Sequence, residues 1–201
     1  NVYHMSIITK EELRKLIENK SIVITPILDE NQFGEITFDF RIGTDFLTQH
    51  QGRNAYIDTT KNSNITRSIK SSYTETRRKL GEEFLIHPSQ PTLFSTLEYV
   101  KLPTDIYAVL NLRSSYSRLG LSISTIVQPG YCGCLSVEIV NSGNTSINIL
   151  TGTRFLQARF FTVSEGTDYF SSTRKYTCQV RPMPSKANED EDLEKLIKLN
   201  L

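Results

Sequence analysis

Residues 112–121 read Leu-Arg-Ser-Ser-Tyr-Ser-Arg-Leu-Gly-Leu, and after a short loop residues 134–143 read Cys-Leu-Ser-Val-Glu-Ile-Val-Asn-Ser-Gly. In the first stretch Arg113 and Arg118 lie around two serines. A turn there can offer hydroxyls, amides and a guanidinium to one anion, because the planar guanidinium matches phosphate oxygens. A surface turn with an incidental salt bridge is the alternative.

The second stretch carries one carboxylate, Glu138, within an apolar strand. Strand side chains alternate, so Cys134, Ser136, Glu138 and Val140 share one face and Leu135, Val137 and Ile139 the other. We expect Glu138 to be buried among small or apolar neighbours, which would raise its pKa and suit a general acid/base. The alternative is a structural carboxylate paired with Arg113 or Arg154.

Composition favours one domain with a single core, because the chain has 201 residues and 38% hydrophobic content. Its 23 basic and 22 acidic residues nearly cancel, which argues against a nucleic-acid or membrane surface. Apolar runs are only strand-sized and the start lacks a leader pattern, so we expect a soluble cytoplasmic protein. Three cysteines without Cys-x-x-Cys pairs and three scattered histidines argue against a structural metal or a disulfide.

The hydrophobic pattern predicts a mainly β protein, a barrel or a sandwich, after one short helix that is capped by Thr9 and ends near Asn19. Gly43 is expected to form a turn after an alternating strand. The predicted strands cover residues 21–25, 35–42, 83–86, 92–97, 106–110, 134–140, 146–150 and 154–163.

Three polar stretches flank these strands. Residues 46–80 are expected to form a solvated surface excursion, with a phosphate-facing role as the alternative. The basic and aromatic cluster at 174–181 can close over a phosphate group or face solvent. Residues 186–201 are expected to form an acidic tail, helical or flexible, after a single domain at 1–185.

Taken together and in order, these stretches resemble the dCTP deaminase family of the dUTPase-like superfamily, and the likeness covers nearly the whole chain. The residues that carry the resemblance are Thr37–Gly43, Phe84–Pro88, Leu102–Pro103, Arg113–Leu121, Glu138, Asn141–Gly143, Lys175–Tyr176 and Gln179.

The resemblance implies a dUTPase-like distorted β-barrel that assembles as a homotrimer, with deoxynucleotide triphosphate sites between subunits and a C-terminal lid. In that family a glutamate activates a water that attacks C4 of cytosine, and Mg²⁺ accompanies the triphosphate without a protein-bound catalytic metal. By position, Glu138 is the acid/base and Ser114 orients the water or the intermediate. The implied substrate-binding residues are Arg113, Ser115, Arg118, Gln128, Tyr131, Tyr169, Lys175 and Gln179.

Two departures from the family pattern bear on the substrate. Residues 122–128 form a base-recognition loop about three residues shorter than usual. The acidic residue before Pro-Gly is replaced by Gln128, and an amide cannot accept a proton at neutral pH. Simple dUTPase chemistry is therefore not expected. Our hypothesis is deamination of dCTP to dUTP and ammonia, and the alternatives are a non-catalytic nucleotide-binding regulator or an enzyme for a different pyrimidine deoxynucleotide.

Overall fold

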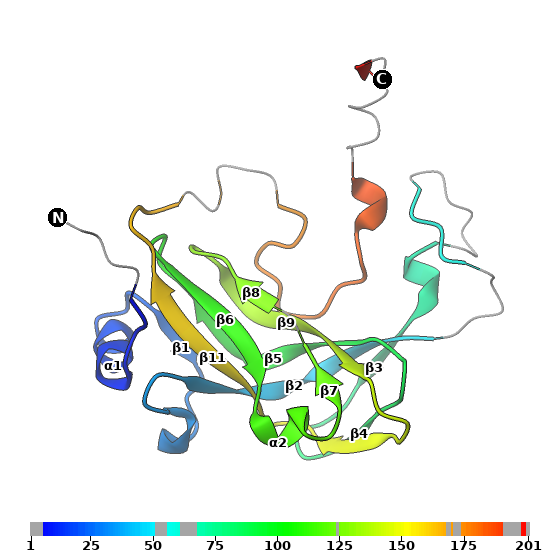
Figure 1. The fold of residues 1–201 in the computed structure, drawn as a ribbon, viewed down its shortest axis with the longest axis horizontal. Coiled ribbons are helices and arrows are strands. Elements are labelled where there is room, and N and C mark those ends of the chain that lie inside the picture. Colours follow the sequence, from blue (N-terminus) through cyan, green and yellow to red (C-terminus); the bar gives the residue numbers. More distant parts are fainter. Residues whose placement is uncertain are drawn as a thin grey trace.

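Strand β9 (Cys132–Asn141) occupies an inner position in a strongly curled sheet, between β7 (Leu121–Ser122) and β5 (Thr92–Lys101) (Figure 1). The computed structural model describes residues 6–50, 56–60, 68–123, 125–167, 170, 174–190 and 198–199. Within these ranges the sheet has nine strands. Its order continues through β2 (Phe38–Gln49), β11 (Arg154–Thr162), β6 (Ile106–Leu112) and β8 (Thr125–Val127), with β1 (Val23–Thr25) added to β5 and β3 (Tyr73–Arg77) added to β2.

All of these strand pairs are antiparallel. The sheet curls until its end strand β8 contacts β9, which gives the predicted distorted β-barrel. A separate antiparallel pair joins β4 (Glu83–Ile86) and β10 (Ile147–Leu150). The mainly β prediction is therefore confirmed.

Helices are short in the described chain. Helix α1 (Lys10–Glu18) begins as predicted at Thr9, whose hydroxyl accepts from the Glu12 amide at 3.5 Å, and ends at Asn19. Helix α2 (Ser114–Ser117) follows β6, and single 3₁₀ turns form η1 (Glu30–Gln32), η3 (Lys70–Ser72) and η4 (Ala187–Glu189). No helix of the described ranges is long and apolar enough to cross a membrane. Most of the predicted acidic helix, residues 191–197, lies outside the described residues.

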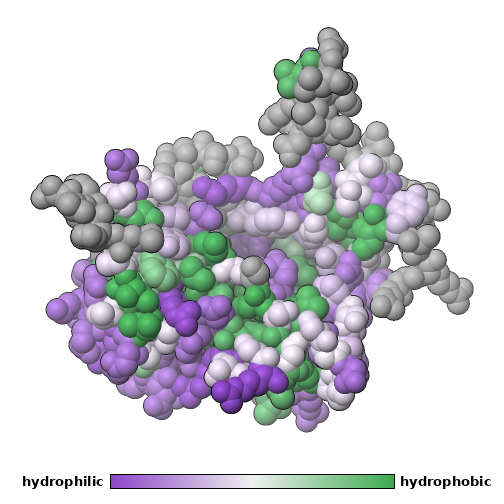
Figure 2. All heavy atoms as spheres, viewed as in Figure 1, coloured by the Kyte–Doolittle hydropathy of each residue, from purple (hydrophilic) through white to green (hydrophobic). Residues whose placement is uncertain are grey.

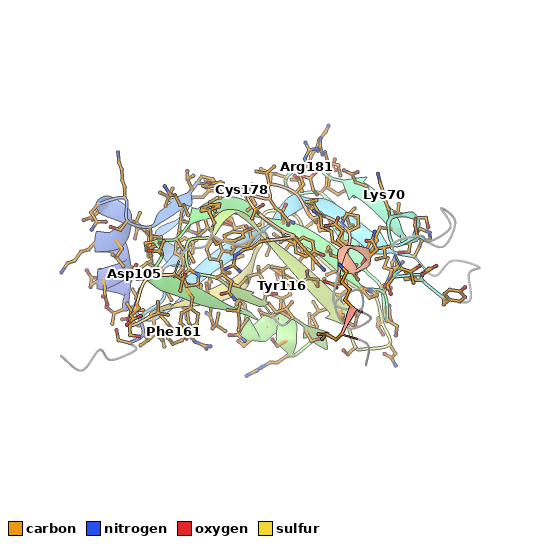
Figure 3. All side chains as sticks on the ribbon, turned by 90° about the horizontal axis from the view of Figure 1, so that it is seen from above. Lys70, Asp105, Tyr116, Phe161, Cys178 and Arg181 are labelled. Atoms are coloured by element: carbon orange, nitrogen blue, oxygen red, sulfur yellow. The ribbon has the colours of Figure 1, made fainter. Side chains whose placement is uncertain are left out.

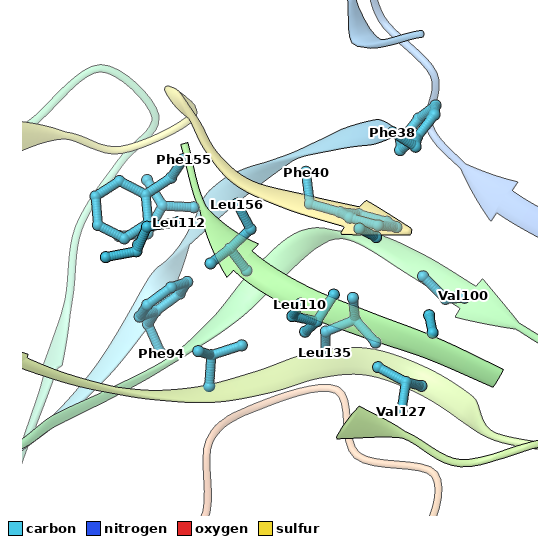
Figure 4. Close-up of a cluster of buried hydrophobic side chains, with 14 of the residues drawn as sticks. Phe38, Phe40, Phe94, Val100, Leu110, Leu112, Val127, Leu135, Phe155 and Leu156 are labelled. Atoms are coloured by element: carbon cyan, nitrogen blue, oxygen red, sulfur yellow. The ribbon is translucent and has the colours of Figure 1, made fainter. Parts of the chain in front are cut away.

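The barrel interior is filled by large side chains from the facing strands (Figure 4). The Phe94 and Phe155 rings meet edge to face, with centroids 5.6 Å apart. Leu110, Leu135 and Leu156 pack in the same core and are almost wholly buried. Each such side chain contributes about 1.5–3 kcal/mol by leaving water, so the core holds the curl of the sheet.

Strand β2 runs through Gly43, where a turn was predicted, so that prediction is wrong. The pairing of β2 with β5 shifts register between Ile42 and Phe46, and the two backbones come close there. A Cβ at position 43 would lie 2.5 Å from the Ser95 carbonyl oxygen, so only glycine fits this approach. β2 consequently continues to Gln49 and pairs with β3, which places strands at both ends of the predicted 46–80 excursion.

A buried carboxyl group sits at the irregular part of β5. Glu98 is fully buried, and its two oxygens accept from the Gln32 side-chain amide and from the Arg41 backbone amide, each at 2.9 Å. Burial raises the pKa of Glu98 from 4.5 to about 7, although both hydrogen bonds favour the charged form. No motif marks the burial of this carboxyl group, which lies within β5.

Replacing Glu98 by glutamine should change the pH dependence of stability. A carboxyl whose pKa is raised on folding contributes stability below 4.5 that is lost as the pH rises to about 7. Between those values the wild type should lose on the order of 3 kcal/mol relative to Glu98→Gln. Urea unfolding at pH 5, 6, 7 and 8 measures this, with the exposed Glu75→Gln as control. Parallel stability curves for the wild type and Glu98→Gln would contradict it.

Candidate functional site

A pocket of about 760 Å³ opens between β8, β9, β3 and the C-terminal segment. We call residues 174–185 the strap, because they cross this pocket. Figure 2 shows the corresponding face hollowed below the C-terminal segment. Of the predicted site residues, the pocket wall includes Gln128, Tyr131, Glu138, Lys175 and Gln179.

Glu138 is the only carboxylate that the described residues contribute to the pocket. The alternation on β9 is as predicted, with Leu135, Val137 and Ile139 facing the core. The expected burial of Glu138 is wrong, however, because the pocket opens in front of the strand and leaves this residue exposed.

The structural alternative for Glu138 also receives no support from its proposed partners. Both Arg113 and Arg154 face Asp39 on β2, which β5 separates from β9. Nε of Arg113 lies 3.0 Å and Nη1 of Arg154 3.8 Å from Asp39 Oδ2. Neither arginine belongs to the pocket wall. Glu138 is therefore placed to meet a ligand rather than either of these cations.

Two aromatic rings, Tyr73 and Tyr176, stand beside Glu138 in the pocket. Burial raises the pKa of Tyr73, and the nearby Tyr176 and Glu138 raise it further. Tyr73 begins β3 within the stretch predicted to be solvated, and no motif marks it. It is a pocket residue that the sequence reasoning missed.

The strap brings cations to the same pocket. Arg174 and Lys175 are both in its wall, and their charge is opposite to that of the Glu138 carboxylate. Lys175 is held by an ion pair with Asp190, in the acidic tail. The Tyr176 hydroxyl accepts from the amide of Lys186, the residue that follows the strap, at 2.7 Å. This hydrogen bond joins the two ends of the strap. Asp190 of the acidic tail is thus paired with Lys175, the cation that was expected to bind phosphate.

Gln128 and Tyr131 close the loop after β8. The Tyr131 amide donates to the Gln128 carbonyl at 3.2 Å, and Gly130 adopts a φ of 77° at the turn. The Tyr131 hydroxyl donates to the Cys134 carbonyl at 2.6 Å, so this ring props the turn against β9. The Gln128 side chain remains exposed at the pocket.

Arg113 anchors α2 to the sheet. Besides its ion pair with Asp39, it donates from Nη1 to the Arg154 carbonyl at 3.3 Å. Asp39 is 6% exposed, and burial raises its pKa against the opposing effect of the Arg113 guanidinium. Direct phosphate binding by Arg113 would require this pair to open, so the geometry favours a positioning role.

The stretches 112–121 and 134–143 pack against each other. The Ser142 amide donates to the Gly120 carbonyl at 2.9 Å, and Leu121 pairs with Asn141. Asn141 is fully buried and donates from Nδ2 to the carbonyls of Ile86 and Thr145. Residues 141–143 are therefore attached to Gly120 and to the start of β7.

The remaining predicted residues lie elsewhere. Ser114, Ser115 and Arg118 are exposed on or directly after α2, and none belongs to the pocket wall of the same chain. Figure 3 shows Tyr116 of α2 on a different part of the molecule from Cys178 of the strap. Tyr169 lies outside the described residues. The predicted site is thus divided into two groups within one chain. The described side chains also include no group of three or more His, Cys, Asp or Glu able to hold a metal ion.

A carboxylate, aromatic rings and cations line one pocket of a curled β-barrel, a set of groups that can hold an anionic ligand that carries a ring. Comparison with known proteins narrows this class. The model of the dCTP deaminase-like family matches residues 7–163, and the chain belongs to that family.

Individual relatives agree. A protein of Methanobrevibacter smithii named "dCTP deaminase, dUMP-forming" is 32% identical over 95% of this chain and 100% of its own length. One of the same name from Methanosphaera stadtmanae is 34% identical over 94% of this chain and 98% of its length. The solved 2'-deoxycytidine 5'-triphosphate deaminase of Agrobacterium tumefaciens shares the fold, with a TM-score of 0.60 and 20% identity. That match covers 80% of this chain and 49% of the solved chain.

Removing the charge of Asp39 should loosen the seat of α2. The Asp39→Asn variant leaves Arg113 and Arg154 without their carboxylate, and we expect a loss of about 1 kcal/mol in unfolding free energy, because burial already disfavours the Asp39 charge. Urea unfolding at pH 7 measures it. The matched control is Glu30→Gln, which breaks the exposed Arg14–Glu30 pair and should leave stability unchanged within error. Equal effects of the two variants would contradict the anchoring role.

Proposed function

We propose that this protein hydrolytically deaminates dCTP, with Glu138 as the acid/base. The observation that carries the proposal is the placement of Glu138 as the single described carboxylate of a pocket that also holds Tyr73, Tyr176 and the cations of the strap. Membership of the dCTP deaminase-like family and the names of the relatives support the substrate. A cytoplasmic location is proposed with it, since that is where free deoxynucleotides are metabolised.

The proposed chemistry uses one proton carrier. Glu138 takes a proton from a water, and the resulting hydroxide attacks C4 of cytosine. The proton then passes to N3, which gives a tetrahedral intermediate with a hydroxyl and an amino group on C4. Glu138 next takes the proton of this hydroxyl and gives it to the exocyclic nitrogen, so that the bond from C4 to nitrogen breaks, ammonia leaves and C4 becomes a carbonyl. Ser114 is proposed to orient the water or the intermediate. Its position outside the pocket wall of its own chain requires that it comes from a second copy.

The triphosphate is proposed to lie toward the strap, as its Mg²⁺ complex. Lys175 and Gln179 are in the pocket wall, and Lys175 would exchange its carboxylate partner Asp190 for a phosphate. Ser115 and Arg118 are exposed and free of the pocket of their own chain, so they are proposed to reach phosphates of a neighbouring site.

We propose a homotrimer on the same ground. One chain holds Glu138 and the strap on one surface and the Arg-Ser-Ser-x-x-Arg cluster on another. A closed ring of copies brings the second surface of each chain against the first surface of the next, because a repeated head-to-tail contact closes by rotation. Three complete sites then form between the subunits.

The product is proposed to be dUMP with diphosphate, following the relatives, and not the dUTP expected from the sequence. Gln128 can hydrogen-bond a water or the sugar but cannot accept its proton. The described pocket wall then leaves Glu138 as the carboxylate available for a second water. Separation of dUMP from dUTP by anion-exchange chromatography decides between these products.

A second candidate function rests on Gln128 and on the shortened stretch at residues 122–128, part of which forms β8. In that case the protein binds a deoxynucleotide as a regulator or acts on a different pyrimidine nucleotide. Calorimetry separates these functions, since a regulator binds dCTP without releasing ammonia and an altered specificity moves both binding and turnover to another base.

Glu138→Gln should reduce ammonia release from dCTP by at least about a hundredfold, because an amide cannot carry the proton. Binding of dCTP, measured by calorimetry, should persist. The matched control is Glu75→Gln, on the exposed side of β3 and outside the pocket wall. Full activity of Glu138→Gln would refute the assigned role.

Mixing two inactive variants tests the shared site. Ser114→Ala and Glu138→Gln chains are co-expressed with different tags, and mixed oligomers are isolated. If each site takes Glu138 from one chain and Ser114 from the next, about one site in three regains both groups in isolated mixed trimers, because each mixed ring contains one productive junction. Activity should rise to roughly a third of wild type. No recovery in isolated mixed oligomers, or a monomer in light scattering, would contradict the shared site.

A further inference from the structure

The strap is seated on the first residues of β9 by a backbone contact. The Cys134 amide donates to the Gln179 carbonyl at 2.7 Å, and Gln179 is 7% exposed. The pocket lies directly beside this contact, since Tyr131 and Gln179 both belong to its wall. The strap therefore holds its closed position through β9 itself.

Gly133 is adapted to that seat. Its φ is 139°, and a Cβ there would lie 2.4 Å from the Gln179 carbonyl oxygen and 2.9 Å from the Gln179 nitrogen. Any side chain at this position would push the strap away from the strand. The close approach is thus specified by the sequence of β9.

One cysteine directly precedes Gly133, and another directly precedes Gln179. Cys132 precedes Gly133, Cys178 precedes Gln179, and their Sγ atoms are 2.7 Å apart although 46 residues separate them. Both are free thiols, and Cys178 is exposed. The spacing of cysteines along the sequence argued against a disulfide, but the strap brings two of them into contact. Figure 3 shows Cys178 at the edge of the body, on the same side as Arg181.

The third cysteine has different surroundings. Cys134 is half-buried, burial raises the pKa of its thiol, and the carboxylates of Glu98 and Asp45 raise it further. Cys134 lies two residues from Cys132 on the same face of β9, but Cys178 contacts Cys132. Cys134 is therefore an internal control for the reactivity of the other two thiols.

We propose that Cys132 and Cys178 form a reversible disulfide that locks the strap over the pocket. The oxidant is a low-molecular-weight disulfide of the glutathione class. The exposed Cys178 thiolate attacks one sulfur of the oxidant, forms a mixed disulfide and displaces one small thiolate. The Cys132 thiol then gives its proton to solvent and attacks Cys178 Sγ, which displaces the second small thiolate. Two protein thiols are oxidised and one small disulfide is reduced to two thiols.

The lock acts on strap opening. In the reduced protein the hydrogen bond from the Cys134 amide to the Gln179 carbonyl holds the strap on β9. A disulfide between Cys132 and Cys178 adds a covalent bond at the same place, so local opening of the strap becomes rarer. Under the proposed function, which this consequence assumes, nucleotide entry and product release slow down. The reduced protein is then the active form, as suits a reducing compartment.

The experiment equilibrates the full-length protein with reduced and oxidised glutathione, blocks free thiols by alkylation and maps the peptides without reduction. We expect one peptide pair that joins Cys132 to Cys178, with Cys134 alkylated. The same pair should form in Cys134→Ser and disappear in Cys178→Ser. Separate glutathionylation of Cys132 and Cys178 with no link, or a link through Cys134, would overturn the proposal.

Hydrogen exchange of strap amides is the second measurement. Exchange should slow by about tenfold or more in the oxidised wild type, return with a dithiol reductant and stay unchanged in Cys178→Ser. Unchanged exchange in the linked protein would overturn the lock. Ammonia release from dCTP should fall on oxidation and recover on reduction. A reduced protein without activity refutes the proposed function alone, because the peptide map and the exchange rates do not depend on turnover.

Discussion

The alternation of side chains along β9 is the constraint on which the rest of the structure depends. Leu135, Val137 and Ile139 are held in the core, and this places Ser136 and Glu138 on the opposite face, where both line the pocket. A slip of one residue would exchange the two faces. The same strand seats the strap at its beginning and the Asn141 turn at its end. Packing in the core therefore sets the direction of Glu138 without any contact to that carboxylate.

Much of the fold could be predicted, because hydrophobic alternation indicates the strands and the capping residue indicates the start of the first helix. The errors have a common physical cause in long-range contact. Gly43 is a turn residue by propensity, yet it serves the close approach of β2 to β5. Glu98 is a charged residue that would be expected at the surface, yet it is buried, and its oxygens accept hydrogen bonds from the Gln32 side chain and the Arg41 backbone amide. Partners far away in the chain decide both cases, and local pattern does not carry that information.

The candidate site was only partly accessible from the sequence, for the same reason. Residue types and order pointed to Glu138 and to the strap, and the structure brings these together. Arg113 has the chemistry of a phosphate ligand but is engaged by Asp39, which only the fold brings near. The exposure of Glu138 depends on how the sheet curls. Tyr73 joins the pocket because β3 pairs with β2, and no pattern in its polar neighbourhood foretells that pairing.

The ion pair between Lys175 and Asp190 gives the binding site a counter-ion supplied by the chain itself. A nucleotide that binds at Lys175 exchanges one anion for another, so its Coulombic gain is the difference between two similar attractions. Release of small ions from solution contributes less to such an exchange than to binding at a bare cation. Under the proposed function, selection at this position would therefore rest on geometry and on the number of phosphate oxygens more than on charge alone.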